Sequence, residues 1–133
     1  MICYSMNNVC IYSSLFFITN AYIAFYYNYV LYSILFVFLV LTSIMYHSTK
    51  NETIKRFDQM FVLLIIMYGG YELLGKWERN KYVIGLVVLC FITVIYLYFS
   101  KEYCMNKDEN TGNMYHALLH VIVCIGHNMI IML

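Results

Sequence analysis

The sequence predicts an all-α integral membrane bundle of about five transmembrane helices, formed by residues 1–133 as a single domain. Hydrophobic residues make up 63% of the 133 residues and charged residues 11%, whereas a soluble domain has about 45–50% apolar and about 25% charged residues. The charges gather in short clusters, and the apolar stretches between them approach the roughly 20 residues that cross a membrane. Proline is absent, so no helix is kinked by a missing backbone amide.

The charged clusters and one turn divide the chain into five expected spans. Their approximate ranges are 9–27, 30–48, 58–75, 82–100 and 114–132. The first two spans form one uncharged stretch, which we divide at residues 26–29, where three tyrosines and Asn28 suit an interfacial turn. No Lys or Arg precedes Lys50, and a cleavable signal peptide needs a positively charged start, so we expect the first span to be retained. We expect every span to be a continuous helix, with Gly69 and Gly70 allowing either close helix approach or a local bend.

The composition also excludes other classes of protein. An aromatic content of 19% with few charges is the reverse of a disordered chain. The net charge of +1 offers no basic surface, so we expect no nucleic-acid partner. The cysteines are odd in number and lack CxxC spacing, which argues against a disulfide framework or a thiolate metal site. They are Cys3, Cys10, Cys90, Cys104 and Cys124.

Polar side chains near the span ends form a pattern. Ser43 and His47 lie four residues apart near the end of the second span, Asp58 opens the third, and His116 and His120 open the fifth. Residues four apart share one helix face. Two crossings, spans three and four, separate Asp58 from His116 and return the chain to the side it left. We therefore expect all five residues at one membrane boundary, where ionisable groups usually mark a function or a buried partner.

Three neutral imidazoles and a water form the usual open tetrahedral zinc site, in which the pKa of the water falls to about 7. Other transition metals also accept imidazole, but zinc needs no redox partner, and the nearby Ser43 and Asp58 suit hydrolysis. Each residue alone has a simpler interpretation: a histidine as a hydrogen-bonded core residue, Asp58 as a helix-start carboxylate, and Ser43 as a back-bonding hydroxyl. The residues leave three interpretations open: a zinc hydrolase, a membrane protein with structural zinc, or polar groups that only join helices.

Other polar residues receive structural interpretations. We expect Asn20 to hydrogen-bond a neighbouring helix. His127 lies seven residues beyond His120, about 10 Å deeper along the helix, and is expected to be a core polar group, with a substrate-channel residue as the alternative. We expect Glu72 to form an interfacial ion pair with Lys76 rather than to act as a second catalytic acid.

The ordered motifs resemble the signature of the CREST superfamily of membrane hydrolases. The S-x3-H motif ends at His47, Asp58 follows eleven residues later, and an H-x3-H motif begins at His116. This superfamily comprises the alkaline ceramidases, the progestin and adiponectin receptor family, and relatives in lipid remodelling and cell fusion. The segment His116–His120 is most similar to the last-helix motif of the alkaline ceramidases. The motif evidence covers about 90 residues, from Ser43 to the end of the sequence.

The resemblance implies a zinc-dependent amidohydrolase that acts on a ceramide-like membrane lipid in an endoplasmic reticulum or Golgi membrane. It implies that His47, His116 and His120 bind Zn²⁺, that Asp58 holds or deprotonates the zinc-bound water, and that Ser43 stabilises the oxyanion. The alternative is a receptor-like or fusion-type member of the same superfamily that keeps a structural zinc site without catalysis.

The chain departs from the family pattern in two ways. Family members typically have seven spans, so this chain is a shortened form whose missing pair falls between Asp58 and His116; removal of a pair keeps the site residues on one side. The acidic segment that binds calcium in the ceramidases has no counterpart, because residues 1–15 contain no Asp or Glu. With fewer spans to enclose a lipid pocket, a homo-oligomer in which a second copy closes the pocket stays open as an alternative.

Overall fold

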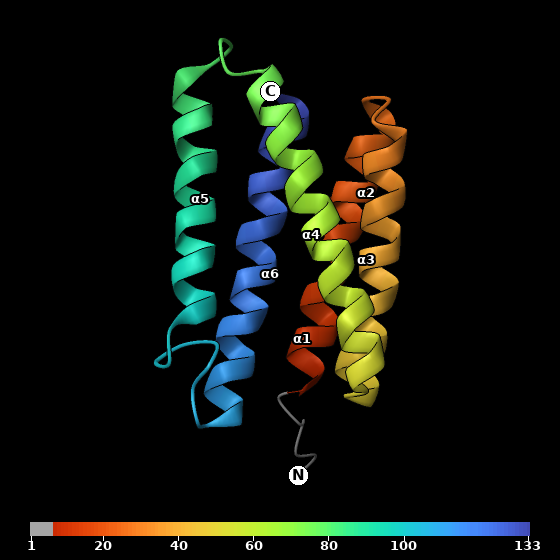
Figure 1. Ribbon diagram of the computed structural model, residues 1–133, viewed down its shortest axis with the longest axis vertical. Helices are drawn as coiled ribbons and strands as arrows, with labels where there is room; N and C mark the ends of the chain where they lie inside the picture. The colour runs from red at the N-terminus through yellow and green to blue at the C-terminus, as the bar shows by residue number, and fades with distance from the viewer. Residues whose placement is uncertain (1–6) are drawn as a thin grey trace.

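The computed structural model describes residues 7–133, which form six helices and five apolar spans (Figure 1). The helices are α1 (Asn7–Ser14), α2 (Phe17–Tyr26), α3 (Val30–Thr49), α4 (Glu52–Gly75), α5 (Lys81–Phe99) and α6 (Glu109–Met132). The spans are Asn8–Tyr26, which joins α1 and α2, and the four single helices α3 to α6. Each is long and apolar enough to cross a membrane, so the predicted helical membrane bundle is confirmed.

The first span is not the continuous helix that we expected. Leu15 and Phe16 separate α1 from α2, and their amides donate to the carbonyl oxygens of Tyr12 and Ser13, both at 3.1 Å. Each of these bonds joins an amide to the carbonyl three residues earlier, as in a 3₁₀-helix. They replace the α-helical bonds, which reach back four residues. The hydroxyls of Ser13 and Ser14 bond back to the preceding turn, which is a known cause of helix bending. The break therefore needs neither proline nor glycine, and the amides of Leu15 and Phe16 stay hydrogen-bonded, as the membrane interior requires.

The predicted turn between the first two spans is confirmed. Helix α2 ends at Tyr26 and α3 begins at Val30. Between them Asn28 adopts a φ of 64°, a left-handed conformation that asparagine tolerates better than most residues.

The third and fifth spans begin earlier than predicted, at Glu52 and Glu109. The Asn51 side chain accepts hydrogen bonds from the amides that open α4, and Asp108 does the same for α6 through Thr111 N at 3.0 Å. The bonds from Thr111 hold the pKa of the Asp108 carboxyl below its usual range. These caps make the charged first turns helical, so Asp58 and His116 lie in second turns instead of opening their spans.

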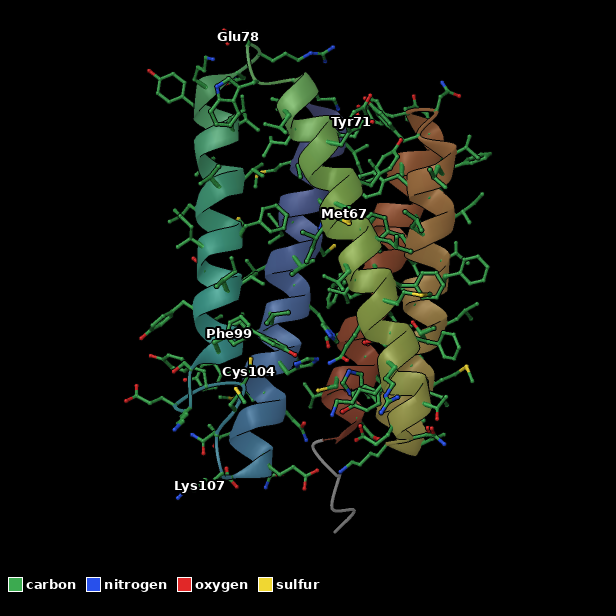
Figure 2. All side chains as sticks on the ribbon, viewed as in Figure 1. Met67, Tyr71, Glu78, Phe99, Cys104 and Lys107 are labelled. Carbon is green, nitrogen blue, oxygen red and sulfur yellow. The ribbon has the colours of Figure 1, made fainter. Side chains whose placement is uncertain are left out.

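The turns and loops between the helices lie at two levels, one at each end of the bundle. The α3–α4 turn and the α5–α6 loop lie at the end of the bundle where α1 begins, and the α4–α5 turn lies at the other end with the C-terminus of α6 (Figure 1). Cys104 and Lys107 mark the first level and Glu78 the second (Figure 2). This arrangement agrees with the predicted alternation of the spans. Helix α6 packs against α1, α2 and α5, while α3 packs against α1, α2 and α4.

The core lies between α2, α3, α4 and α6. Its largest fully buried side chains include Tyr32, Phe36 and Ile65. In contrast, α4 and α5 expose large apolar side chains such as Met67 and Phe99 (Figure 2), as lipid-facing helices do. Four cysteines are free thiols, and Cys3 lies outside the described residues. The free cysteines are Cys10, Cys90, Cys104 and Cys124.

Candidate metal centre

Three imidazoles meet near the membrane boundary at which α3 ends and α6 begins. The ring centroids lie 5.2 Å apart for His47 and His116, 5.6 Å for His47 and His120, and 4.6 Å for His116 and His120. One ligand nitrogen from each ring lies within 4.8 Å of the other two. Tetrahedral zinc, with nitrogens at about 2.0–2.1 Å, places its ligand atoms about 3.4 Å apart. The three imidazoles are therefore grouped closely enough to be candidate ligands of one metal ion.

The local sequence explains why the rings meet. His116 and His120 occupy successive turns of one face of α6, and His47 lies in the last turn of α3. The end of α3 is tied to the start of α6 by an ion pair between Lys50 and Glu109. Both partners of this pair are exposed, so it contributes little stability by itself. It nevertheless joins the two helices at the end of the bundle nearest to the imidazoles.

The chemistry of the cluster fits a cation. His120 is buried, and Nε2 of His47 is buried with no hydrogen-bond partner in the described part of the chain. Leaving such an atom unpaired costs about 1–3 kcal/mol, and a metal ion relieves this cost by accepting the nitrogen lone pair. Three imidazoles are one of the protein donor sets that catalytic zinc sites use.

Ser43 and Asp58 lie at the same end of the bundle but have other partners. The Ser43 hydroxyl is buried and lies 2.9 Å from Ser14 Oγ, while Asp58 Oδ1 accepts a hydrogen bond of 3.1 Å from Thr42 Oγ1. Thr42 and Ser43 point about 100° apart around α3. Among the described residues, no hydrogen bond joins Asp58 or Ser43 to an imidazole. The structure thus brings the three histidines into direct proximity, whereas Ser43 and Asp58 lie at the same end of the bundle bonded to Ser14 and Thr42.

Three hydroxyl residues that were not predicted from the sequence contact the candidate site residues, namely Ser13, Ser14 and Thr42. Ser13 Oγ lies 2.9 Å from His120 Nδ1, and Ser14 and Thr42 contact Ser43 and Asp58 respectively. The available signal was an adjacent pair of hydroxyls in an apolar span that, by the alternation of spans, begins at the same boundary as the histidines. Uncharged serines in a helix are common, so the pair did not stand out.

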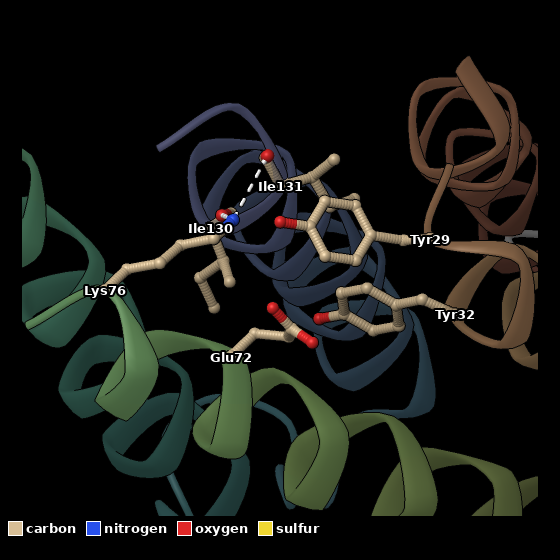
Figure 3. Close-up of a pocket in the computed structure, with 6 residues that line it drawn as sticks. All are labelled: Tyr29, Tyr32, Glu72, Lys76, Ile130 and Ile131. Carbon is tan, nitrogen blue, oxygen red and sulfur yellow. Dashed lines mark hydrogen bonds between the residues drawn. The ribbon is translucent and has the colours of Figure 1, made fainter. Parts of the chain in front are cut away.

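The residues at the opposite boundary correct one expectation. Lys76 is 6% exposed, and its Nζ donates to the carbonyl oxygens of Ile130 at 2.7 Å and Ile131 at 3.3 Å, at the end of α6. Its ammonium also lies 4.6 Å from the centroid of the Tyr29 ring. Glu72 instead lies near Tyr32 (Figure 3). No ion pair joins Glu72 and Lys76 within residues 7–133, so that prediction was wrong: the free carbonyls of α6 take the ammonium.

The hollow at this opposite boundary is small. Its empty space is about 110 Å³ with open solvent included, it has no room for a water-sized sphere, and it is lined by residues that include Tyr32, Glu72 and Lys76 (Figure 3). Ligand sites usually measure about 300–1,000 Å³. The hollow is therefore too small for a lipid head group with its chains.

Two polar residues in the bundle interior behave largely as predicted. Asn20 Nδ2 donates to the carbonyl of Cys124 at 2.9 Å and to Asn128 Oδ1 at 2.8 Å, which confirms its bond to a neighbouring helix. His127 is fully buried, and its Nδ1 is hydrogen-bonded to the Tyr32 hydroxyl, as expected for a core polar group. Its Nε2 has no partner in the described structure.

Comparison with known proteins identifies no relative: no family model, curated protein or solved structure matches the chain. The resemblance to the CREST superfamily thus stands on motif order and spacing. Any functional conclusion depends on the arrangement of the side chains themselves.

Proposed function

We propose that the chain is a zinc-dependent intramembrane hydrolase of a ceramide-like lipid amide. The observation that carries this proposal is the convergence of His47, His116 and His120 from α3 and α6, with one nitrogen of each within 4.8 Å of the others. Two histidines four apart arise easily in a helix. A third from a different span, placed against both rings and with an unpartnered buried nitrogen, is much less easily explained as helix packing alone.

His47, His116 and His120 would hold the zinc ion, which would supply a Lewis acid that lowers the pKa of water to about 7 and polarises a carbonyl. Asp58 is the proposed general base and acid: it would take a proton from the water that attacks the carbonyl carbon and give it to the amide nitrogen as the carbon–nitrogen bond breaks. Its Oδ1 is held by Thr42, which leaves the second carboxylate oxygen for this transfer. Ser43 is the proposed donor to the developing oxyanion, after its hydroxyl turns from Ser14.

The position of the imidazoles suits a lipid substrate. They lie near one end of the apolar spans, so the acyl chain can stay among the lipids while the amide reaches water at the boundary. Helices α4 and α5 pack chiefly on α3 and α6 respectively. Further walls for the acyl chain come from surrounding lipid or from a second copy of the chain. By the family resemblance, the proposed membrane is that of the endoplasmic reticulum or Golgi.

One observation favours a second function, that of a non-catalytic, receptor-like or fusion-type member with structural zinc. Asp58 and Ser43 bond to Thr42 and Ser14 rather than to an imidazole. In such a protein the metal would only fasten α3 to α6.

The Asp58→Asn variant separates the two functions. For an enzyme, we expect one zinc per chain to be retained and fatty-acid release from ceramide to fall by about 100-fold or more, since general acid–base catalysis contributes 10²–10⁴-fold. The measurements are metal analysis and product release from purified protein in lipid nanodiscs. Asp108→Asn, an identical change at an exposed carboxylate, is the control and should retain activity. Wild-type protein that holds zinc but releases no fatty acid would favour the non-catalytic function, and wild type without stoichiometric zinc would contradict both.

A further inference from the structure

The break between α1 and α2 brings two hydroxyls of the first span against the candidate metal centre. Ser13 Oγ lies 2.9 Å from His120 Nδ1, and both side chains are buried. Ser14 Oγ lies 2.9 Å from Ser43 Oγ. We infer that Ser13 is a positioning residue that fixes His120 in the tautomer whose Nε2 binds the metal. This inference rests on the metal centre of the proposed function.

The single hydroxyl proton of Ser13 determines which residue donates in its hydrogen bond with His120. Ser13 Oγ also lies 3.0 Å from the carbonyl oxygen of Cys10, which can only accept a hydrogen bond. A serine carries a single hydroxyl proton. Both contacts are hydrogen bonds only if Ser13 donates to Cys10 and accepts from His120. His120 therefore carries its proton on Nδ1.

A proton on Nδ1 leaves the lone pair of the neutral ring on Nε2. This is the usual arrangement in metal sites, where the second ring nitrogen donates to an oxygen that sets the tautomer and the orientation of the ring. Phe17, the first residue of α2, lies against the same ring with centroids 5.3 Å apart. Both helices that flank the break thus contact His120: α1 through the hydrogen bond of Ser13, and α2 through the packing of Phe17.

The adjacent serine provides a close control. Ser14 is also buried in the last turn of α1 and also donates to the Cys10 carbonyl, at 2.7 Å. It contacts Ser43 instead of His120. Changing Ser14 to alanine therefore removes the same kind of back-bond from the same turn and leaves the acceptor of His120 in place.

The first test reads the tautomer directly in metal-free protein. Nitrogen-15 NMR of histidine-labelled protein in micelles distinguishes Nδ1–H from Nε2–H rings, and the His120→Gln variant identifies the His120 signals. We expect His120 to be Nδ1–H in the wild type, in Ser13→Thr and in Ser14→Ala, and to populate both tautomers in Ser13→Ala. An Nε2–H ring in the wild type, or an unchanged ring in Ser13→Ala, would overturn the inference.

The second test measures zinc affinity by competition with a chromophoric chelator. Loss of such a supporting hydrogen bond typically weakens metal binding 10–100-fold. We expect a loss in that range for Ser13→Ala, recovery in Ser13→Thr, and a change of less than about threefold in Ser14→Ala. Equal zinc affinity in Ser13→Ala and wild type overturns the inference and leaves the proposed function intact. Absence of zinc binding in the wild type defeats the proposed function, while the tautomer test still decides the role of Ser13.

Discussion

Zinc and fatty-acid release are both expected to disappear when His116 is changed to alanine. The His116 ring lies against both other rings, with its centroid 5.2 Å from that of His47 and 4.6 Å from that of His120. Its loss leaves two imidazoles, which is fewer than the three protein ligands that catalytic zinc sites use. Without bound metal, water keeps its ordinary pKa and the carbonyl loses its Lewis acid.

The measurement pairs zinc content with fatty-acid release from a panel of ceramides. For His116→Ala we expect zinc to fall from one per chain to near zero and release to fall at least about 100-fold, since metal activation supplies several kcal/mol. Met114→Ala is the control, because this exposed side chain lies two residues earlier on α6. Equal rates of release in His116→Ala and wild type would remove the proposed mechanism.

The Gly69→Ala variant is expected to fold with markedly lower stability. A Cβ at Gly69 would lie 2.6 Å from the Tyr32 hydroxyl and 2.9 Å from His127 Cε1. Both neighbours are fully buried and are hydrogen-bonded to each other, so neither moves without breaking the contact between α3 and α6. Overpacking of this kind costs about 1–3 kcal/mol.

Gly70→Ala is the matched control, because a Cβ there meets no atom within 4 Å. That change should be neutral or slightly stabilising, since alanine is the better helix former. We expect thermal unfolding in detergent to shift downward by about 5–10 °C for Gly69→Ala and to rise or stay constant for Gly70→Ala. Zinc bound per folded chain should not change, because the Tyr32–His127 contact lies deeper along α6 than the candidate metal centre. Matching melting temperatures for the two variants would show that α4 does not pack closely at Gly69.

The membrane-spanning lengths of the helices and the meeting of the three histidines could both be predicted from the sequence. A hydrocarbon layer of fixed thickness requires about 20 apolar residues per span, and charges avoid it. The clusters around Lys50, Lys76 and Lys101 therefore mark the places where the chain reverses. Alternation of the spans then brings His47 near His116. The four-residue spacing of His116 and His120 places both rings on one face of the same helix, which is a matter of helix geometry alone. His120 therefore joins the other two histidines.

Only the tertiary structure decided how each helix is rotated and where it is interrupted. The lengths of the apolar stretches do not specify which neighbour Asp58 meets, and it meets Thr42. Nor do these lengths reveal that Lys76 donates to a carbonyl at the end of α6 and forms no ion pair with Glu72 in the described structure. They also do not show that Ser13, next to the break in the first span, contacts His120. The physical reason is that hydrophobic burial in a bilayer determines depth, whereas side-chain partners depend on packing and hydrogen bonds between helices distant in sequence.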